Sequence, residues 1–461
     1  MKHPYLTSTL GVVLAAGLLF TGCNKGPGGL SSSSSLKSAE PTSFAQVTKQ
    51  LDPGGNLYLY LSTEQFLEGL AGKVANLRQL TEALPNLQDN DRANLGRAVD
   101  IVTNLITASG LQEISGFGMS SIATEKQFYH TKMLLHHYPG QGKGFLWAMF
   151  GQKPHELEGL RLLPTHTALA AFSDADLPLV WSVIQKQAGQ SGFPQADEWL
   201  GRWPGLFEQF TGLKWDQALN SLGGEFGIVV TLDEGHMITL PIPGGNSPLE
   251  IPEPALMLVA KVNDDTIFNR IETALTKVGQ MVVTNDTPGL KMRTVPVPLP
   301  LPIQLRPTVA TSEGYLFIAT SDALVRDALA TRSGKKPGLR STDEFQHLAK
   351  DMPQQGNQFS FVSQRLGQTF LTVQSQALER IPDGGKAEAL QSLFKSAHAG
   401  FGFSVSANTD EGWLSVCNGN EHAAKVLVAG AVVPVAVASA IAIPAIAKLK
   451  ARAQHGQDSG Q

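Results

Sequence analysis

Three stretches of this chain share one arrangement of apolar and polar residues, an apolar strand that ends in Ser and runs into a helical pattern. The predicted strands cover Gly55–Ser62, Thr167–Ser173 and Gly356–Ser363. A short apolar run followed by apolar residues at helical spacing is typical of a strand that leads into a helix. Because a Ser hydroxyl can accept a hydrogen bond from a first-turn amide, each terminal Ser is predicted to cap the next helix.

Each of these strands is followed by two helical stretches and a hairpin. The helices are predicted at Thr63–Leu84, Asp91–Ser109, Asp174–Ala188, Ala196–Phe210, Gln364–Arg380 and Lys386–Ser396. The returning strands of the hairpins are predicted at Phe128–Tyr138, Ala255–Val262 and Trp413–Cys417. The chain therefore repeats a strand–helix–helix–hairpin unit three times, within residues 44–160, 161–350 and 351–420.

A further block of elements is inserted before the third unit. Its helices and strands are predicted at Asp264–Val278, Leu290–Val297, Tyr315–Thr320, Ser321–Ala330 and Asp343–Lys350. The strands pair as hairpins, and the helices come in groups between hairpins rather than one after each strand. This pattern favours an α+β fold, with antiparallel sheets and helices packed on them. Two lobes and one pseudo-repeated sheet both fit this pattern.

The N-terminus has the plan of an export signal. Lys2 and His3 precede the apolar run Leu10–Phe20, and Thr21-Gly22-Cys23 follows. Residues 19–23 resemble the bacterial lipobox, in which a peptidase cuts before a Cys that receives diacylglycerol. The resemblance implies a signal peptide at 1–22 and lipidation at Cys23. Residues 23–43 are rich in Gly and Ser and are predicted to be a flexible tether. A plain cleaved signal is the alternative.

The C-terminal part contains a second candidate anchor. The run Val426–Ala447 has no charged residue, and Lys448, Lys450 and Arg452 follow it. As a helix it would be about 33 Å long, enough to cross a bilayer. The basic residues predict a cytoplasmic tail at 448–461 and a body on the other side of the membrane. An apolar tail that docks without spanning is the alternative.

Residues near the middle of the chain resemble a known pattern. Thr211-Gly212-Leu213 and Leu222-Gly223-Gly224-Glu225 are similar to the TGL…LGGE signature of an uncharacterised family of bacterial envelope proteins. A later strand–Ser–helix part of that signature matches Gly314–Ser321 and the helix after it. The resemblance covers residues 160–420 and implies a fold and an envelope location, but no activity.

Composition excludes several classes of protein. A formal charge of −4 and the lack of a basic stripe argue against binding to nucleic acid. With 42% hydrophobic and 16% charged residues, the chain is globular rather than disordered. Its two cysteines, Cys23 and Cys417, are too few for a disulfide framework or a structural zinc site.

Candidate catalytic and metal-binding residues fail on spacing. His130 and His136 share a face of one predicted strand but lie about 20 Å apart, too far to share a metal. The loop Gly140–Gly144 has neither dinucleotide nor P-loop spacing. Asp233-Glu234 and Asp410-Glu411 each precede a Gly and are predicted to form turns. We therefore predict no catalytic residue, no cofactor and no metal site.

A Pro-rich run is the one candidate surface for a protein partner. In Val295–Ile303 apolar residues alternate with Pro, which suits an extended segment with one buried face at a sheet edge. A stiff loop that resists aggregation is the alternative.

These observations favour a non-catalytic, membrane-anchored envelope lipoprotein that acts as a scaffold or interaction module. The predicted location is the inner membrane with a periplasmic body, and the outer membrane is the alternative because Asn24 follows Cys23. Two other functions stay open: a periplasmic carrier or sensor of an apolar ligand, held between a curved sheet and its helices, and a hydrolase. A large apolar cavity would favour the carrier.

Overall fold

The computed structural model describes residues 42–82, 89–192, 194–240, 249–277, 282–297, 305–378 and 400–420. These residues fall in one compact unit, Thr42–Gln461. Cys23, most of the tether, the predicted helix Lys386–Ser396, the apolar run Val426–Ala447 and the basic tail lie outside the described residues.

The strands and helices alternate in groups along the chain. The strands are β1 Leu57–Ser62, β2 Gly116–Glu125, β3 Phe128–His136, β4 His155–Glu156, β5 Thr167–Asp174, β6 Leu222–Leu240, β7 Leu249–Val262, β8 Val283–Thr287, β9 Leu290–Thr294, β10 Thr308–Ser312, β11 Tyr315–Ala319, β12 Gln355–Gly356, β13 Gln358–Val362, β14 Gly402–Thr409 and β15 Gly412–Gly419. The α-helices are α2 Phe44–Gln50, α3 Glu64–Leu67, α4 Leu70–Glu82, α5 Asp89–Ser109, α6 Phe145–Ala148, α7 Leu177–Gln190, α8 Pro194–Thr211, α9 Trp215–Ser221, α10 Thr266–Lys277, α11 Asp322–Arg332, α12 Asp343–Leu348 and α13 Gln364–Leu378.

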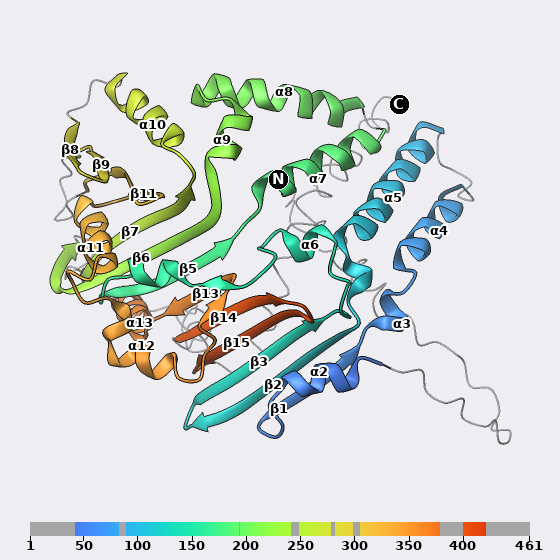
Figure 1. Cartoon of the computed structure of the whole chain (residues 1–461), viewed down its shortest axis with the longest axis horizontal. Helices are drawn as coiled ribbons and strands as arrows, with labels where there is room; N and C mark the ends of the chain where they lie inside the picture. Colours follow the sequence, from blue (N-terminus) through green and yellow to red (C-terminus); the bar gives the residue numbers. More distant parts are fainter. Residues whose placement is uncertain are drawn as a thin grey trace. The chain divides into compact units, whose positions relative to one another are not determined.

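Within the described part of the chain, thirteen strands form one sheet in the order β1-β2-β3-β15-β14-β13-β5-β6-β7-β11-β10-β9-β8 (Figure 1). Every neighbouring pair is antiparallel. The short strands β4 and β12 pair separately. The prediction of an α+β fold with a large antiparallel sheet is confirmed.

Three groups of strands have the same internal order. The first strand pairs with the second and the second with the third in β1-β2-β3, β5-β6-β7 and β13-β14-β15. The third group lies between the other two, because β15 pairs with β3 and β13 pairs with β5. The inserted strands β11, β10, β9 and β8 extend the sheet beyond β7.

One face of this sheet, which we call the outer face, carries the largest core. Phe317, Phe361 and Phe403 point to this face and are fully or almost fully buried. They pack in a cluster with Leu324 of α11 and Phe345 of α12. Farther along the same face, α2 covers the sheet through Val47 and Leu51, which contact Leu134 of β3.

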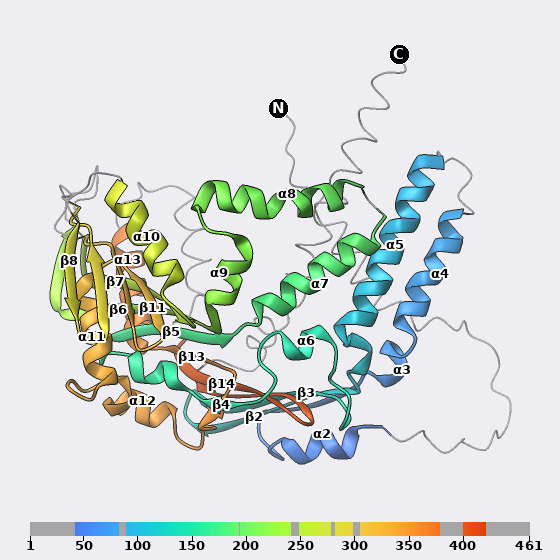
Figure 2. The ribbon, with the colours of Figure 1, turned by 45° about the horizontal axis from the view of Figure 1, so that its top comes forward.

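The opposite face, which we call the inner face, is covered at its two ends. At one end Leu67 and Trp147 pack against Leu135 and Trp413. At the other end Phe268 of α10 packs against Leu316. Figure 2 shows the strands bending from β6 and β7, which stand upright, to β2 and β3, which run level, with α7 and α9 inside the bend.

Two of the predicted helix caps are wrong. Ser363 and Ser321 do accept from backbone amides of their helices, at 3.1 and 3.2 Å. Ser173 instead donates to the carbonyl of Asp174. Helix α7 begins at Leu177, and its N-cap is Asp176, whose carboxylate accepts from Leu179 N–H. Ser62 remains in β1. Strand β5 continues past Ser173 and β1 ends at Ser62, so neither Ser is the residue directly before its helix.

The described helices include none that is both long and apolar enough to span a membrane. The predicted spanning segment Val426–Ala447 falls outside them. The Pro-rich run is described only as far as Val297. Val295 and Val297 donate to the carbonyls of Pro307 and Leu305, at 2.9 and 3.1 Å, so this part pairs with residues 305–307 on one side.

Candidate ligand-binding site

The centre of the inner face is a surface of small and hydroxylated side chains. Because side chains alternate between faces along a strand, the register of the sheet fixes which ones share the inner face. One cross-strand row runs through Thr131, Cys417, Ser404, Ser360, Ala171, Ile228, Leu258 and Ile318. The neighbouring row runs through Met133, Ser415, Ser406, Gln358, Ser173, Phe226 and Ala260. Both rows change from polar to apolar as they cross from β13 to β6 and β7.

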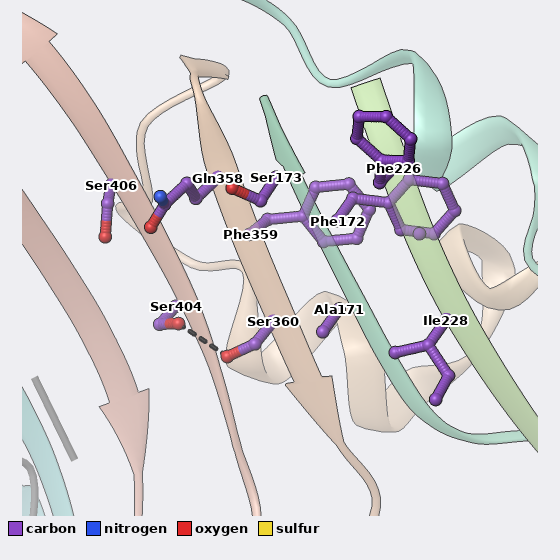
Figure 3. A pocket seen from close by; sticks show the side chains of 11 residues that line it. Ala171, Phe172, Ser173, Phe226, Ile228, Gln358, Phe359, Ser360, Ser404 and Ser406 are labelled. Carbon is purple, nitrogen blue, oxygen red and sulfur yellow. Dashed lines mark hydrogen bonds between the residues drawn. The ribbon is translucent and has the colours of Figure 1, made fainter. Parts of the chain in front are cut away.

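A pocket of about 440 Å³ lies over the middle of these two rows. It is lined by Ala171, Phe172, Ser173, Phe226, Gly227, Ile228, Gln358, Phe359, Ser360, Ser404 and Ser406. Figure 3 shows Ser404, Ser406 and Gln358 toward β14, and Phe226 with Ile228 on β6. The rings of Phe172 and Phe359 belong to the outer core, because these residues alternate with the inner-face residues Ala171 and Ser360 along their strands. The volume lies within the range of small-molecule sites, about 300–1,000 Å³.

The two faces of the same strands differ in how well they are covered. On the outer face, Met257 of β7 and Phe317 of β11 are both 0% exposed. On the inner face, Leu258 of β7 and Ile318 of β11 are each 45% exposed, and their row leads directly into the pocket. Within the part of the chain that the structure describes, the centre of the inner face is therefore an uncovered, partly apolar surface.

The hydroxyls of the pocket pair with one another. Ser360 and Ser404 lie 2.7 Å apart, as do Ser406 and Ser415 (Figure 3 for the first pair). None of these four has a histidine or a carboxylate as its hydrogen-bond partner, so none is activated as a nucleophile. Small hydroxylated side chains of this kind can offer donors and acceptors to a polar part of a ligand.

A polar cluster at the ends of β5 and β13 fixes the loop around β4. The Nδ1 atom of His155 lies 2.8 Å from the carbonyl of Glu156, and Nε2 lies 2.9 Å from the Asp174 carboxylate. Both partners can only accept, so both nitrogens donate when the ring is protonated. Asn357 donates to the same carboxylate at 3.0 Å. Burial lowers the pKa of His155, but the hydrogen bonds to Asp174 and Glu156 outweigh it and raise the pKa overall.

The glutamate of the LGGE motif is buried beside this cluster. Tyr315 donates its hydroxyl to Glu225 at 2.9 Å, and the Arg332 guanidinium lies over the Tyr315 ring at 4.8 Å. Burial raises the pKa of Glu225 above its usual range, and the bond from Tyr315 opposes that shift. Burial and the nearby carboxylate raise the pKa of Tyr315 to about 12. These contacts hold β6 to β11 across the outer face.

The histidines of β3 have separate partners. His130 contacts Asn418 at 2.6 Å, whereas His136 contacts the Ser115 hydroxyl at 2.6 Å. Burial lowers the pKa of His136. Ser115 and His136 are both buried beneath α2, where Ser43 donates to the Ser115 carbonyl. Because both side chains are buried, a substrate cannot reach this Ser–His pair.

The acidic pairs predicted as turns differ in position. Asp410-Glu411 forms the tight connection between β14 and β15, as predicted. Asp233-Glu234 lies inside the long strand β6, at an irregularity in its pairing with β7, and Asp233 contacts His236 at 2.8 Å. In the described residues, no group of three or more His, Cys, Asp or Glu side chains is placed to hold a metal ion.

Comparisons with protein-family models, curated proteins and solved structures find no match to this chain. The resemblance to the envelope-protein signature and the lipidation of Cys23 therefore stay predictions from the sequence.

Sequence reasoning missed the residues of the pocket. One signal for them is the alternation of Phe359-Ser360-Phe361 in β13 and of Phe403-Ser404-Val405-Ser406 in β14. In each strand the apolar side chains enter the outer core and the serines face the pocket. This alternation predicts a half-covered sheet, but it does not say that the serines of β13 and β14 lie next to Ala171 and Ile228.

Proposed function

We propose that this protein is a non-catalytic, membrane-anchored envelope protein that binds an apolar or amphipathic, lipid-like ligand on the inner face of its sheet. The observation that carries the proposal is the difference between the two faces of β13, β14, β7 and β11. Their outer side chains are buried, while Leu258 and Ile318 on the inner face remain about half exposed beside the pocket.

The chemistry of the face favours a ligand with two parts. A hydrocarbon chain would cover Ile228, Leu258 and Ile318, and a hydroxyl, ester or amide group would reach Ser360 and Ser404. Covering the exposed half of a Leu or Ile side chain recovers about 1 kcal/mol. Two such side chains contribute about 2 kcal/mol, which corresponds to roughly 30-fold in affinity.

The anchors in this proposal come from the sequence. Lipidation of Cys23 and a spanning helix at Val426–Ala447 would hold the body at the membrane that contains such ligands. A scaffold without a ligand is the competing function, and it predicts that the inner face binds no small molecule.

A binding titration tests the proposal. The full-length chain in lipid nanodiscs is titrated with a fluorescent long-chain fatty acid, and the signal from empty nanodiscs is subtracted. We expect saturable binding that weakens roughly 30-fold in the double variant Leu258→Ser, Ile318→Ser. Val283→Ser is the matched control, because Val283 is similarly exposed but lies on the outer face of β8.

Two results would contradict the proposal. Binding that is absent from the full-length chain would favour the scaffold. Equal affinity in the double variant and in the parent chain would place the ligand elsewhere on the protein.

A further inference from the structure

Helix α8 carries an apolar face that is only half covered. Trp199, Trp203, Leu206, Phe207 and Phe210 follow one another at spacings of one, three and four residues and lie within one side of the helix. A helix of this length in a soluble body normally buries such a face. In α8 no side chain from residue 197 to 211 is buried.

The covered half packs on an aromatic cluster between α7 and α9. The Trp215 ring lies 5.7 Å from Trp203 and 4.9 Å from Phe207, and Trp181 packs on its other side at 5.2 Å. These contacts fix the orientation of α8. Figure 2 shows α8 on the side of α7 and α9 that is away from β2 and β3.

The uncovered half is large and apolar. Trp199 is 52% exposed, Leu206 is 41% exposed and Phe210 is 83% exposed. We propose that these three side chains, the α8 patch, insert into the interfacial region of a lipid bilayer. Trp, Phe and Leu on one face of a surface helix are the side chains that insert at this depth, and Trp is enriched at membrane interfaces because its ring is apolar while its N–H can bond to water.

The charge on α8 selects the kind of lipid. Residues 197–211 include Asp197, Glu198 and Glu208 but only one basic residue, Arg202, a net charge of −2. The whole chain has a formal charge of −4. An anionic membrane would repel this surface, so the patch binds through apolar insertion and prefers zwitterionic lipid.

The two anchors predicted from the sequence would hold the body that carries α8 at a membrane. Residues 24–41 separate the predicted lipid on Cys23 from Thr42 and would reach about 25 Å as a flexible tether. On the other side, only residues 421–425 lie between Asn420 and the apolar run that begins at Val426. This inference does not depend on a ligand at the inner face.

Quenching of tryptophan fluorescence by brominated lipid tests the proposal. The full-length chain is reconstituted into vesicles of phosphatidylcholine with brominated acyl chains. We expect the brominated lipid to quench up to the share that one tryptophan among six contributes to the total emission, and we expect Trp199→Phe to remove most of this quenching. Phe210→Trp in the Trp199→Phe chain should restore the lost share. Trp413→Phe is the control, because Trp413 lies on the inner face against Leu67 and Trp147.

The outcomes separate the alternatives. Quenching that is unchanged by Trp199→Phe, and not raised by Phe210→Trp, would overturn the proposal. The proposal would also be overturned if a second copy of the chain covers the patch and keeps the brominated chains away from it. A molecular mass that rises with protein concentration would reveal such a dimer. Replacing half of the lipid with phosphatidylglycerol should weaken the quenching, and stronger quenching would contradict the charge argument.

Discussion

At the scale of single residues, a buried carboxylate on the outer face depends on one hydroxyl. Glu225 is buried and its pKa is raised by that burial, while the Tyr315 hydroxyl is its hydrogen-bond donor. An acid whose folded pKa is raised holds its proton more tightly in the folded state. Stability therefore falls as pH rises from the unfolded value of 4.5 through the folded pKa.

Tyr315→Phe isolates the contribution of that hydroxyl. The Phe ring keeps its place under the Arg332 guanidinium, but the ionised carboxylate loses its donor. We expect the free energy of unfolding to fall by about 1–3 kcal/mol at pH 8 and by less at pH 5, where protonation of the carboxyl relieves the loss. Urea denaturation at both values measures this. A pH-dependent cost that persists in a Glu225→Gln chain would contradict the assignment.

His155 has the opposite charge and the same direction of pH dependence. Its pKa is raised overall by Asp174 and Glu156, so the stability that it contributes is present below the unfolded value of 6.5 and is lost as pH rises through the folded pKa. His155→Gln should lower stability at pH 5.5 and change it little at pH 9. The effect should stay below about 1 kcal/mol, because the side chain is nearly half exposed. NMR titration of the ring measures the pKa directly.

At the scale of elements, the sequence pattern and the structure disagree about which residue caps α7. The pattern predicts Ser173 as the cap, whereas Asp176 accepts from the Leu179 amide. Asp176→Ala should therefore lower the free energy of unfolding by about 1 kcal/mol, and Ser173→Ala should cost much less. Thermal unfolding followed by circular dichroism compares the two, and the reverse order would contradict the structure.

The elements themselves were largely predictable from the sequence. Most of the predicted helices and strands are present, because amphipathic periodicity is a local property that packing preserves. The expected helix Thr63–Leu84 is instead two helices, α3 and α4, with Gly69 in a left-handed conformation between them. A glycine in that conformation ends a helix, and its backbone angle is not visible in a hydrophobic pattern.

The arrangement of the units and the site were not predictable. The sequence gives no reason for β15 to pair with β3 or for β13 to pair with β5, since these pairs join strands that are more than a hundred residues apart. Ser360, Ala171 and Ile228 meet only because of those pairings. A single Ser in an apolar strand therefore has no functional meaning until its cross-strand neighbours are known.

At the scale of the whole molecule, one sheet serves two purposes. Its outer face supplies the core on which α11 and α12 pack, and this core gives the body its rigidity. Among the described residues its inner face is free between the helices at its ends, so the proposed ligand would bind without disturbing the main core. Variants of the inner face, such as Leu258→Ser, should therefore change affinity with little effect on stability. If Leu258→Ser lowered the free energy of unfolding as much as the free energy of ligand binding, the inner face would serve stability rather than binding.

Photo-crosslinking tests the central claim most directly. Membranes that contain the full-length chain are irradiated with a long-chain fatty acid that carries a diazirine on its hydrocarbon chain, and labelled peptides are located by mass spectrometry. We predict labels on the segments of β6, β7 and β11 that hold Ile228, Leu258 and Ile318, reduced by excess unlabelled fatty acid. Labels confined to other parts of the chain, or labels that excess fatty acid does not reduce, would contradict a ligand-binding inner face.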